Sequence, residues 1–244
     1  MKEYLIFAGV NGAGKSTFYG TDIVKKKHIP QERVNSDEIL KEKGGDWKDS
    51  VEQATAMKEA VRRINEYIKK GISFNQETTL TGNSIINNIK KAKQQGYTVN
   101  VYYVGLKSAD LAVERVKQRV EMGGHGISEE DIRRRYKQSL ENLQKIVPLC
   151  DNVYVYDNTN QFYLVAIYKN GKLSHQKDCE WLEKYVENKE NDVTLKDNRS
   201  KETHLFSMDS WKKEIEQSGN TIDFLDVGKN TDNTIDTINE KERR

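Results

Sequence analysis

The chain has 244 residues, of which 32% are charged, yet its formal net charge at pH 7 is only +2. That length suits one α/β domain with an appendage or two small domains, and the charge balance gives no support to nucleic acid as the main partner. No apolar run reaches the roughly 18 residues of a membrane-spanning helix, the first apolar run lacks a basic leader, and the two cysteines have no metal-ligand spacing, so we expect a cytoplasmic protein with reduced thiols.

The first element is an apolar run at 4–8, which predicts a buried strand, and a P-loop motif follows it at once. In this strand–turn–helix context, backbone N–H groups surround the phosphates of a nucleotide. Lys15 reaches the β- and γ-phosphates, and the Ser16 hydroxyl holds Mg²⁺. The predicted nucleotide-binding residues are Gly9, Asn11, Gly12, Ala13, Gly14, Lys15, Ser16 and Thr17.

The elements after the P-loop alternate between strands and helices, which is typical of a parallel sheet covered on both faces. Strands are predicted over 32–36, 72–76, 99–106, 153–156 and 162–168, and helices over 15–26, 47–70, 84–95, 108–121, 129–146 and 179–186. The short link between the last two strands predicts an antiparallel hairpin at the sheet edge. We therefore expect an α/β, mostly parallel doubly wound domain over 1–186. A polar, flexible tail over 187–244, with a short apolar stripe at 205–215, completes the chain.

Acidic residues stand where two of the predicted strands end. Asp37 follows the second strand and Glu77, with Thr78, follows the third. The carboxyl ends of strands in such a sheet converge on the ligand, so Asp37 is a candidate to take a substrate proton or to coordinate Mg²⁺. The alternatives are that Ser36 or Asp37 caps a helix, and that Glu77 is a polar residue leaving the sheet.

Arginines flank a glycine-rich segment at 123–126. Arg115 and Arg119 are four residues apart on one helix face, and Arg135 follows the hinge. A lid that carries arginines supplies positive charge to a transferred phosphoryl group and excludes water. The alternative is a solvated basic face. His125 has no second histidine near it, so it is interpreted as a hinge or base-contacting residue rather than a metal ligand.

Five motifs occur along the chain in this order: the P-loop, Asn35-Ser36-Asp37, Glu77-Thr78-Thr79, the Gly123–Gly126 hinge and Arg135-Tyr136. Through these motifs, the sequence resembles the zeta toxin family of small P-loop kinases over about 1–185. The resemblance implies a P-loop kinase fold and ATP-dependent phosphorylation of a hydroxyl of a nucleotide sugar, UDP-N-acetylglucosamine. It also implies that the protein is the toxin of a pair and has an antitoxin protein as its partner.

The same resemblance implies functional roles for individual residues of this chain. The implied catalytic residues are Lys15, Asp37, Arg119 and Arg135, the implied substrate-binding residues are Asp37, Glu77, Thr78 and Arg115, and the implied Mg²⁺ ligands are Ser16 and Asp37. A second hypothesis is a nucleotide-binding or hydrolysing switch that acts through partners. Its usual signature, a strand ending in Asp-Glu, does not occur here.

Overall fold

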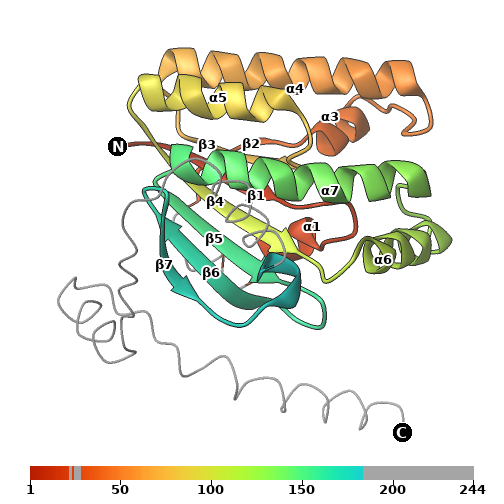
Figure 1. The fold of residues 1–244 in the computed structure, drawn as a ribbon. Helices are drawn as coiled ribbons and strands as arrows, with labels where there is room; N and C mark the ends of the chain where they lie inside the picture. Colours follow the sequence, from red (N-terminus) through yellow and green to blue (C-terminus); the bar gives the residue numbers. More distant parts are fainter. Residues whose placement is uncertain (22–23, 25–28, 184–244) are drawn as a thin grey trace, which may run out of the picture. The chain divides into compact units, whose positions relative to one another are not determined.

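A computed structural model describes residues 1–21, 24 and 29–183 and shows a seven-stranded sheet with the order β2-β3-β1-β4-β5-β6-β7 (Figure 1). The strands are β1 (Lys2–Ala8), β2 (Glu32–Val34), β3 (Phe74–Thr78), β4 (Tyr97–Gly105), β5 (Asn152–Asp157), β6 (Tyr163–Lys169) and β7 (Lys172–Gln176). The first five strands are parallel, and β6 and β7 are added antiparallel to the β5 edge. The predicted sheet with its edge hairpin is confirmed.

Helices cover both faces of this sheet (Figure 1). They are α1 (Lys15–Tyr19), α3 (Ser36–Glu42), α4 (Ser50–Lys70), α5 (Asn83–Gln94), α6 (Ala109–Glu121) and α7 (Glu129–Ile146). The larger core cluster contains residues of α3, α4, α5 and most of α7, and the smaller one contains α1 and α6. Strand side chains alternate between the clusters: Tyr4 and Ile6 of β1 enter the first, and Leu5 and Phe7 the second.

Helix α4 differs from its sequence pattern in the residues that it buries. The apolar residues at helical spacing include Val51 and Met57, but these are 71% and 60% exposed. The buried stripe instead runs at four-residue spacing through Ala56, Ala60, Ile64 and Ile68. Met57, with the neighbouring Val61, lines the cavity described in the next subsection, whereas Val51 does not.

Most predicted boundaries agree with the structure to within about three residues, but three regions differ. Helix α1 ends at Tyr19 and is capped by Gly20, α3 forms a separate short helix, and β7 was not predicted. The helix predicted over 179–186 is described only to Glu183, and the predicted tail over 187–244 lies outside the described residues. Within the described part of the chain, no helix combines the length and apolarity needed to cross a membrane.

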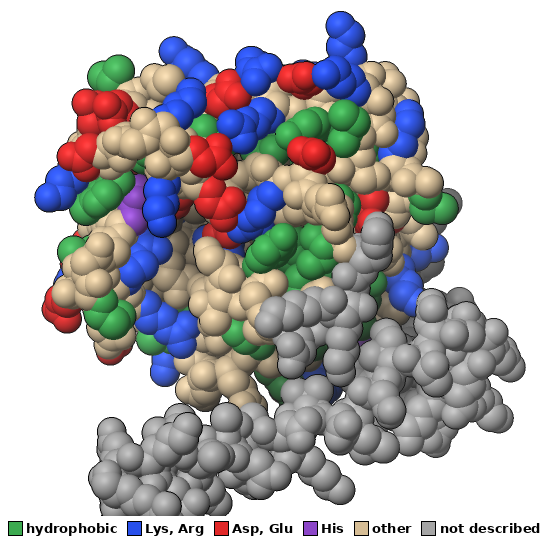
Figure 2. All heavy atoms as spheres, turned by 180° about the vertical axis from the view of Figure 1, so that it is seen from behind, with side chains coloured by type: hydrophobic (Ala, Val, Ile, Leu, Met, Phe, Trp, Pro, Cys, Tyr) green, Lys and Arg blue, Asp and Glu red, His purple; other side chains and the backbone are tan. Residues whose placement is uncertain are grey.

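The surface reflects the near balance of charge in the sequence. On the face shown in Figure 2, acidic and basic side chains are intermingled rather than gathered into areas of one sign. Charged side chains of the helices also pair with one another, such as Arg62 with Glu59 and Glu66 on α4. Exposed pairs of this kind contribute little to the free energy of unfolding. They keep the surface hydrated but do not determine the fold.

Candidate active site

The P-loop follows β1 and adopts the conformation that its glycines predict. Gly9, Gly12 and Gly14 have φ angles of 144°, 80° and 89°. A Cβ atom on Gly9 would lie 2.2 Å from the carbonyl oxygen of Val104, and one on Gly14 would lie 2.6 Å from Nδ2 of Asn158. Any side chain at these positions would therefore force the loop away from its neighbours, and the backbone would no longer surround a phosphate group.

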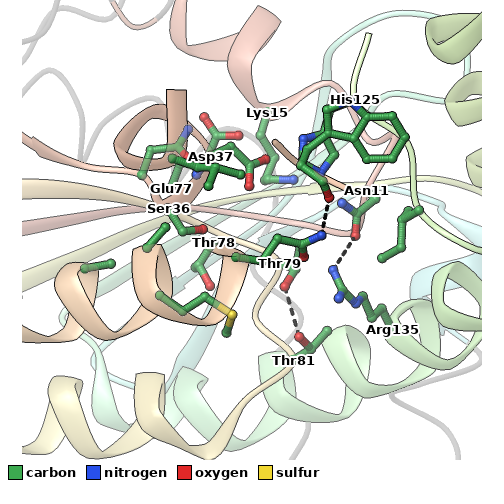
Figure 3. Close-up of a pocket in the computed structure, with 18 of the residues that line it drawn as sticks. Asn11, Lys15, Ser36, Asp37, Glu77, Thr78, Thr79, Thr81, His125 and Arg135 are labelled. Atoms are coloured by element: carbon green, nitrogen blue, oxygen red, sulfur yellow. Dashed lines mark hydrogen bonds between the residues drawn. The ribbon is translucent and has the colours of Figure 1, made fainter. Parts of the chain in front are cut away.

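Lys15 projects from the P-loop into the cavity (Figure 3). Its side chain is buried, and Nζ donates a hydrogen bond to the carbonyl oxygen of Val10 at 3.2 Å. Burial lowers the pKa of the ammonium group, while the carboxylates of Glu77 and Asp37 act in the opposite direction. A buried cation with one backbone partner is suited to binding the terminal phosphates of a nucleotide.

Asp37 lies in the first turn of α3, and its side chain faces the same cavity (Figure 3). The helix cap is Asn35, whose Oδ1 accepts a hydrogen bond from the backbone N–H of Asp37 at 2.9 Å. The alternative that Ser36 or Asp37 caps the helix is therefore wrong. Among the described residues the Asp37 carboxylate has no hydrogen bond or ion pair of its own. It is available to accept a proton or to contact a cation.

Glu77 lies at the end of β3, next to β1, and faces the P-loop serine. Ser16 Oγ is 3.0 Å from Oε1 of Glu77 and 3.2 Å from Oε2. Oε2 also accepts a hydrogen bond from Arg33 Nη2 at 2.7 Å. Glu77 was predicted to bind the substrate, but in the structure its contacts are with the serine expected to hold Mg²⁺. Nothing in the sequence singled out Arg33, because β2 carries it and only the folded sheet brings β2 beside β3.

The oxygen atoms around Ser16 fit a magnesium ion. Mg²⁺ prefers hard oxygen ligands and usually keeps several waters and phosphate oxygens in its coordination shell. Ser16, Glu77 and Asp37 offer a hydroxyl and two carboxylates at one end of the cavity. The described residues contain no group of three or more His, Cys, Asp or Glu that could hold a metal by themselves. Waters and the phosphate oxygens of a nucleotide would complete the shell of a cation here.

The three arginines predicted around the lid occupy different positions. Arg119 on α6 lines the cavity, and its Nε is buried without a hydrogen-bond partner in the described residues. Arg135 on α7 reaches Oδ1 of Asn11 through Nη1 at 3.3 Å (Figure 3), and burial lowers the pKa of its guanidinium group. Arg115 also lines the cavity but donates to the carbonyl oxygen of Thr159 at 3.0 Å. Of the three arginines, Arg119 and Arg135 are therefore the better candidates to bind an anion in the cavity.

The hinge between α6 and α7 lies across the cavity from α3. His125 packs on Trp47 with a distance of 4.9 Å between ring centroids, and its side chain points into the cavity (Figure 3). Burial lowers the pKa of His125, and Arg119 and Arg135 lower it further, while Asp37 raises it. The surroundings of His125 thus favour the neutral form of the imidazole. The sequence did not predict that Trp47 would be its neighbour.

One cavity of about 890 Å³ is lined by the site residues Asn11, Lys15, Ser16, Asp37, Trp47, Glu77, Arg115, Arg119, His125 and Arg135, whereas Gly9 and Arg33 lie outside its lining. The end beside the P-loop carries the charged groups described above. The other end, between α4, β3 and α5, is lined by uncharged side chains: Gln53, Met57, Val61, Thr78, Thr79, Thr81, Ser84 and Asn88. Thr79 and Thr81 hydrogen-bond to each other at 2.9 Å. The cavity can therefore hold an anionic group at one end and a neutral, hydroxyl-rich or amide-bearing molecule at the other.

Comparison with known proteins shows what this chain is similar to. The family model for Zeta toxin matches residues 2–171. An uncharacterised protein of Haemophilus influenzae is 34% identical over 134 residues, which is 54% of this chain and 91% of that protein.

Among solved structures, the complex of AvrRxo1-ORF1 and AvrRxo1-ORF2 with sulphate ions is similar, with a TM-score of 0.55 and 17% identity over 76% of this chain. The structure of the same pair with ATP has a TM-score of 0.53 and 16% sequence identity over 83% of this chain. This chain spans 64% and 66% of the matched chains in the two structures. At such identities the likeness shows a shared fold.

Proposed function

Because the chain belongs to the zeta toxin family, we propose that it is an ATP-dependent kinase that transfers a phosphoryl group to a hydroxyl of a small molecule. The observation that carries this proposal is the cavity itself, in which the P-loop, a carboxylate without a partner and two arginines face a neutral compartment. A phosphoryl donor and an acceptor could lie end to end in it. ATP as the donor agrees with the fold shared with a protein solved with ATP.

Asp37 is proposed as the general base. Phosphoryl transfer to an alcohol requires a group that accepts the hydroxyl proton as the oxygen attacks. Asp37 lines the cavity, and helix α3 holds its backbone through the Asn35 cap. Its exposed carboxylate has no partner among the described residues to give up before it binds the acceptor hydroxyl.

Positive charge around the transferred group would come from Lys15, Arg119 and Arg135. The migrating phosphoryl group spreads negative charge over three oxygens, and fixed cations at those oxygens lower the barrier. Arg119 Nε is buried and finds no hydrogen-bond partner in the part of the chain that the structure describes, which costs free energy that a bound anion would recover. Ser16 and Glu77 would hold Mg²⁺, which when bound neutralises the charge on the phosphates. Arg115 lines the same cavity while it donates to the carbonyl oxygen of Thr159, and its predicted role in binding the substrate stays a proposal.

For the acceptor, we propose a nucleotide sugar such as UDP-N-acetylglucosamine, as membership of the family suggests. The hydroxyl and amide groups at the neutral end of the cavity, among them Thr79, Ser84 and Asn88, suit the hydroxyl and acetamido groups of an amino sugar. Such an activity would remove a precursor of the bacterial cell wall. The protein would then be a toxin, and an antitoxin that covers the cavity would be its natural partner.

The test is incubation of the purified protein with ATP, Mg²⁺ and a panel of nucleotide sugars, followed by mass detection. We expect one acceptor to gain 80 mass units, the mass of one phosphoryl group added in place of a proton. The matched control is Asp37→Asn, which keeps the shape of the side chain but cannot take the proton. Hydrolysis of ATP with no phosphorylated acceptor would favour the second hypothesis, a nucleotide-hydrolysing switch.

A further inference from the structure

Arg33, on β2, makes more directional contacts than any residue discussed so far. Nη2 donates to Oε2 of Glu77 at 2.7 Å, and Nη1 donates to Oδ1 of Asn75 at 3.1 Å. Nε lies 3.0 Å from Oε1 of Glu38. The guanidinium carbon also lies 4.0 Å from the centre of the Tyr19 ring, on α1 directly after the P-loop. These contacts join four elements around one side chain.

The Arg33–Glu77 ion pair is well shielded from water, unlike the pairs on the surface. The side chains of Arg33 and Glu77 are 15% and 10% exposed, whereas Glu38 on the outer side is 49% exposed. A shielded, short, charge-assisted hydrogen bond fixes the orientation of both partners more firmly than an exposed one. The side chain of Asn75 is itself buried and is held by the carbonyl oxygen of Pro30 at 2.8 Å. Arg33 is therefore also held by Asn75, which lies two residues before Glu77 on β3.

The two oxygens of Glu77 are shared between two partners. Oε2 is held by Arg33, and Oε1 is the nearer oxygen to Ser16 Oγ at 3.0 Å. Lys15 is also close enough for the negative charge of Glu77 to act on its pKa. If the arginine were absent, the Glu77 carboxylate could turn toward the Lys15 ammonium group. Both groups would then be lost to the nucleotide and its cation.

We propose that Arg33 is a positioning residue for the magnesium–nucleotide site: it holds Glu77 against Ser16 and keeps it from pairing with Lys15. This inference rests on the proposed use of Mg²⁺ and ATP. It assigns Glu77 to the cation side of the site rather than to the acceptor. Arg33 itself does not line the cavity and touches neither substrate nor reacting atoms, so its effect is transmitted through Glu77.

The experiment measures how the affinity for a fluorescent ATP analogue depends on Mg²⁺ concentration, which needs no turnover and no identified acceptor. Arg33→Met should raise the Mg²⁺ concentration for half-maximal binding about tenfold. This is the lower end of the loss in metal affinity that is typical when a residue that orients a metal ligand is removed. Arg33→Lys should restore only part of this, because an ammonium group cannot hold Glu77 and Asn75 together. The matched control, Glu38→Gln, removes the exposed partner of the same arginine and should change the value less than about twofold.

A merely structural role would give a different pattern. Glu77→Gln should reproduce the shift in Mg²⁺ dependence, and the double variant Arg33→Met with Glu77→Gln should add nothing further. The inference is overturned if Arg33→Met or Arg33→Lys keeps the Mg²⁺ dependence of the wild type, or if the effects of the two changes simply add. Should Arg33→Met fail to fold, Arg33→Lys and Glu77→Gln carry the same test. Because the readout is binding, a failed search for the acceptor leaves the result valid.

Discussion

At the P-loop end of the cavity, charged side chains are held by specific partners: Lys15 by a backbone carbonyl, Glu77 by Ser16 and Arg33, and Arg135 by Asn11. At the other end, between α4 and α5, the lining is uncharged and includes the exposed Met57 and Val61. Under the proposed function, the first end would hold the phosphate groups of the donor and the second end the acceptor. Substitutions at the two ends should then change different kinetic parameters.

The largest effect is expected at the P-loop. Lys15→Ala should lower turnover by about 10³-fold or more, because the lysine supplies charge to the transferred group. The thermal midpoint should not fall, since the buried ammonium group is desolvated in the folded state. Steady-state kinetics and differential scanning calorimetry measure the two quantities. A variant with wild-type turnover would remove the P-loop from the mechanism.

Asp37→Asn should come next, with turnover lowered by about 10²–10⁴-fold and ATP affinity little changed. The amide keeps the position in α3 but cannot accept a proton. If ATP affinity fell in proportion to turnover, Asp37 would be chiefly a Mg²⁺ ligand. In bacteria, expression of the wild type should arrest growth or cause lysis and expression of Asp37→Asn should not. If bacteria tolerated expression of both proteins equally well, the result would contradict the proposal that the protein is a toxin.

Substitutions at the uncharged end of the cavity should change the KM for the acceptor and leave the KM for ATP unchanged. Thr79→Val removes a hydroxyl from the cavity at nearly constant volume and should raise the acceptor KM by about fivefold, the cost of about 1 kcal/mol for one hydrogen bond. The KM for ATP should stay constant. Thr55→Val is the matched control, because Thr55 is exposed on the same helix as Gln53 but does not line the cavity. A changed ATP KM in Thr79→Val would show that the two ends are not separable.

The tail beyond the kinase domain is expected to have little effect on chemistry. Truncation after residue 186 should leave turnover and the thermal midpoint unchanged, because the polar composition of 187–244 offers little apolar area to bury. A rise in turnover would indicate that the apolar stripe at 205–215 inhibits the enzyme. Loss of soluble protein would contradict the proposed domain boundary.

The smallest effect concerns pH. The pKa of His125 is lowered in the folded state, so the unfolded chain binds its proton first as the pH falls. The stability contributed by the neutral imidazole is complete above pH 6.5 and is lost as the pH falls from there through the lowered pKa. The wild type should therefore lose more of its thermal midpoint between pH 7.5 and 5.5 than His125→Asn. Equal losses in the two proteins would show that His125 does not titrate in this window.

The parts that could be predicted from sequence are those set by local spacing. The glycines and Lys15 of the P-loop mark both the strand before them and the helix after them, and Asp37 stands directly after a short strand. The fold class could also be predicted, because the crossover connections between parallel strands are almost always right-handed and alternating strands and helices therefore have few possible topologies. Family membership is likewise confirmed, since the order of the motifs is specific.

The remaining features depend on contacts between distant residues. Arg33 and Glu77 are 44 residues apart, and only the 2-3-1 order of strands brings them together. The Trp47–His125 contact joins two loops, whose path no periodic pattern encodes. On α4, the helical period of the apolar residues is correct, but which stripe is buried depends on tertiary packing that the sequence pattern does not specify. The roles of the individual site residues stay predictions.

The central claim is that a phosphoryl group leaves ATP for an acceptor hydroxyl rather than for water. It is tested most directly by supplying ATP labelled at the γ-phosphate to bacterial small-molecule extract, with wild type and Lys15→Ala in parallel, and by following where the label goes. The account predicts that the wild type moves the label into one small molecule that is not inorganic phosphate, and that Lys15→Ala does not. Label appearing only as inorganic phosphate, at the same rate with and without the extract, would contradict it.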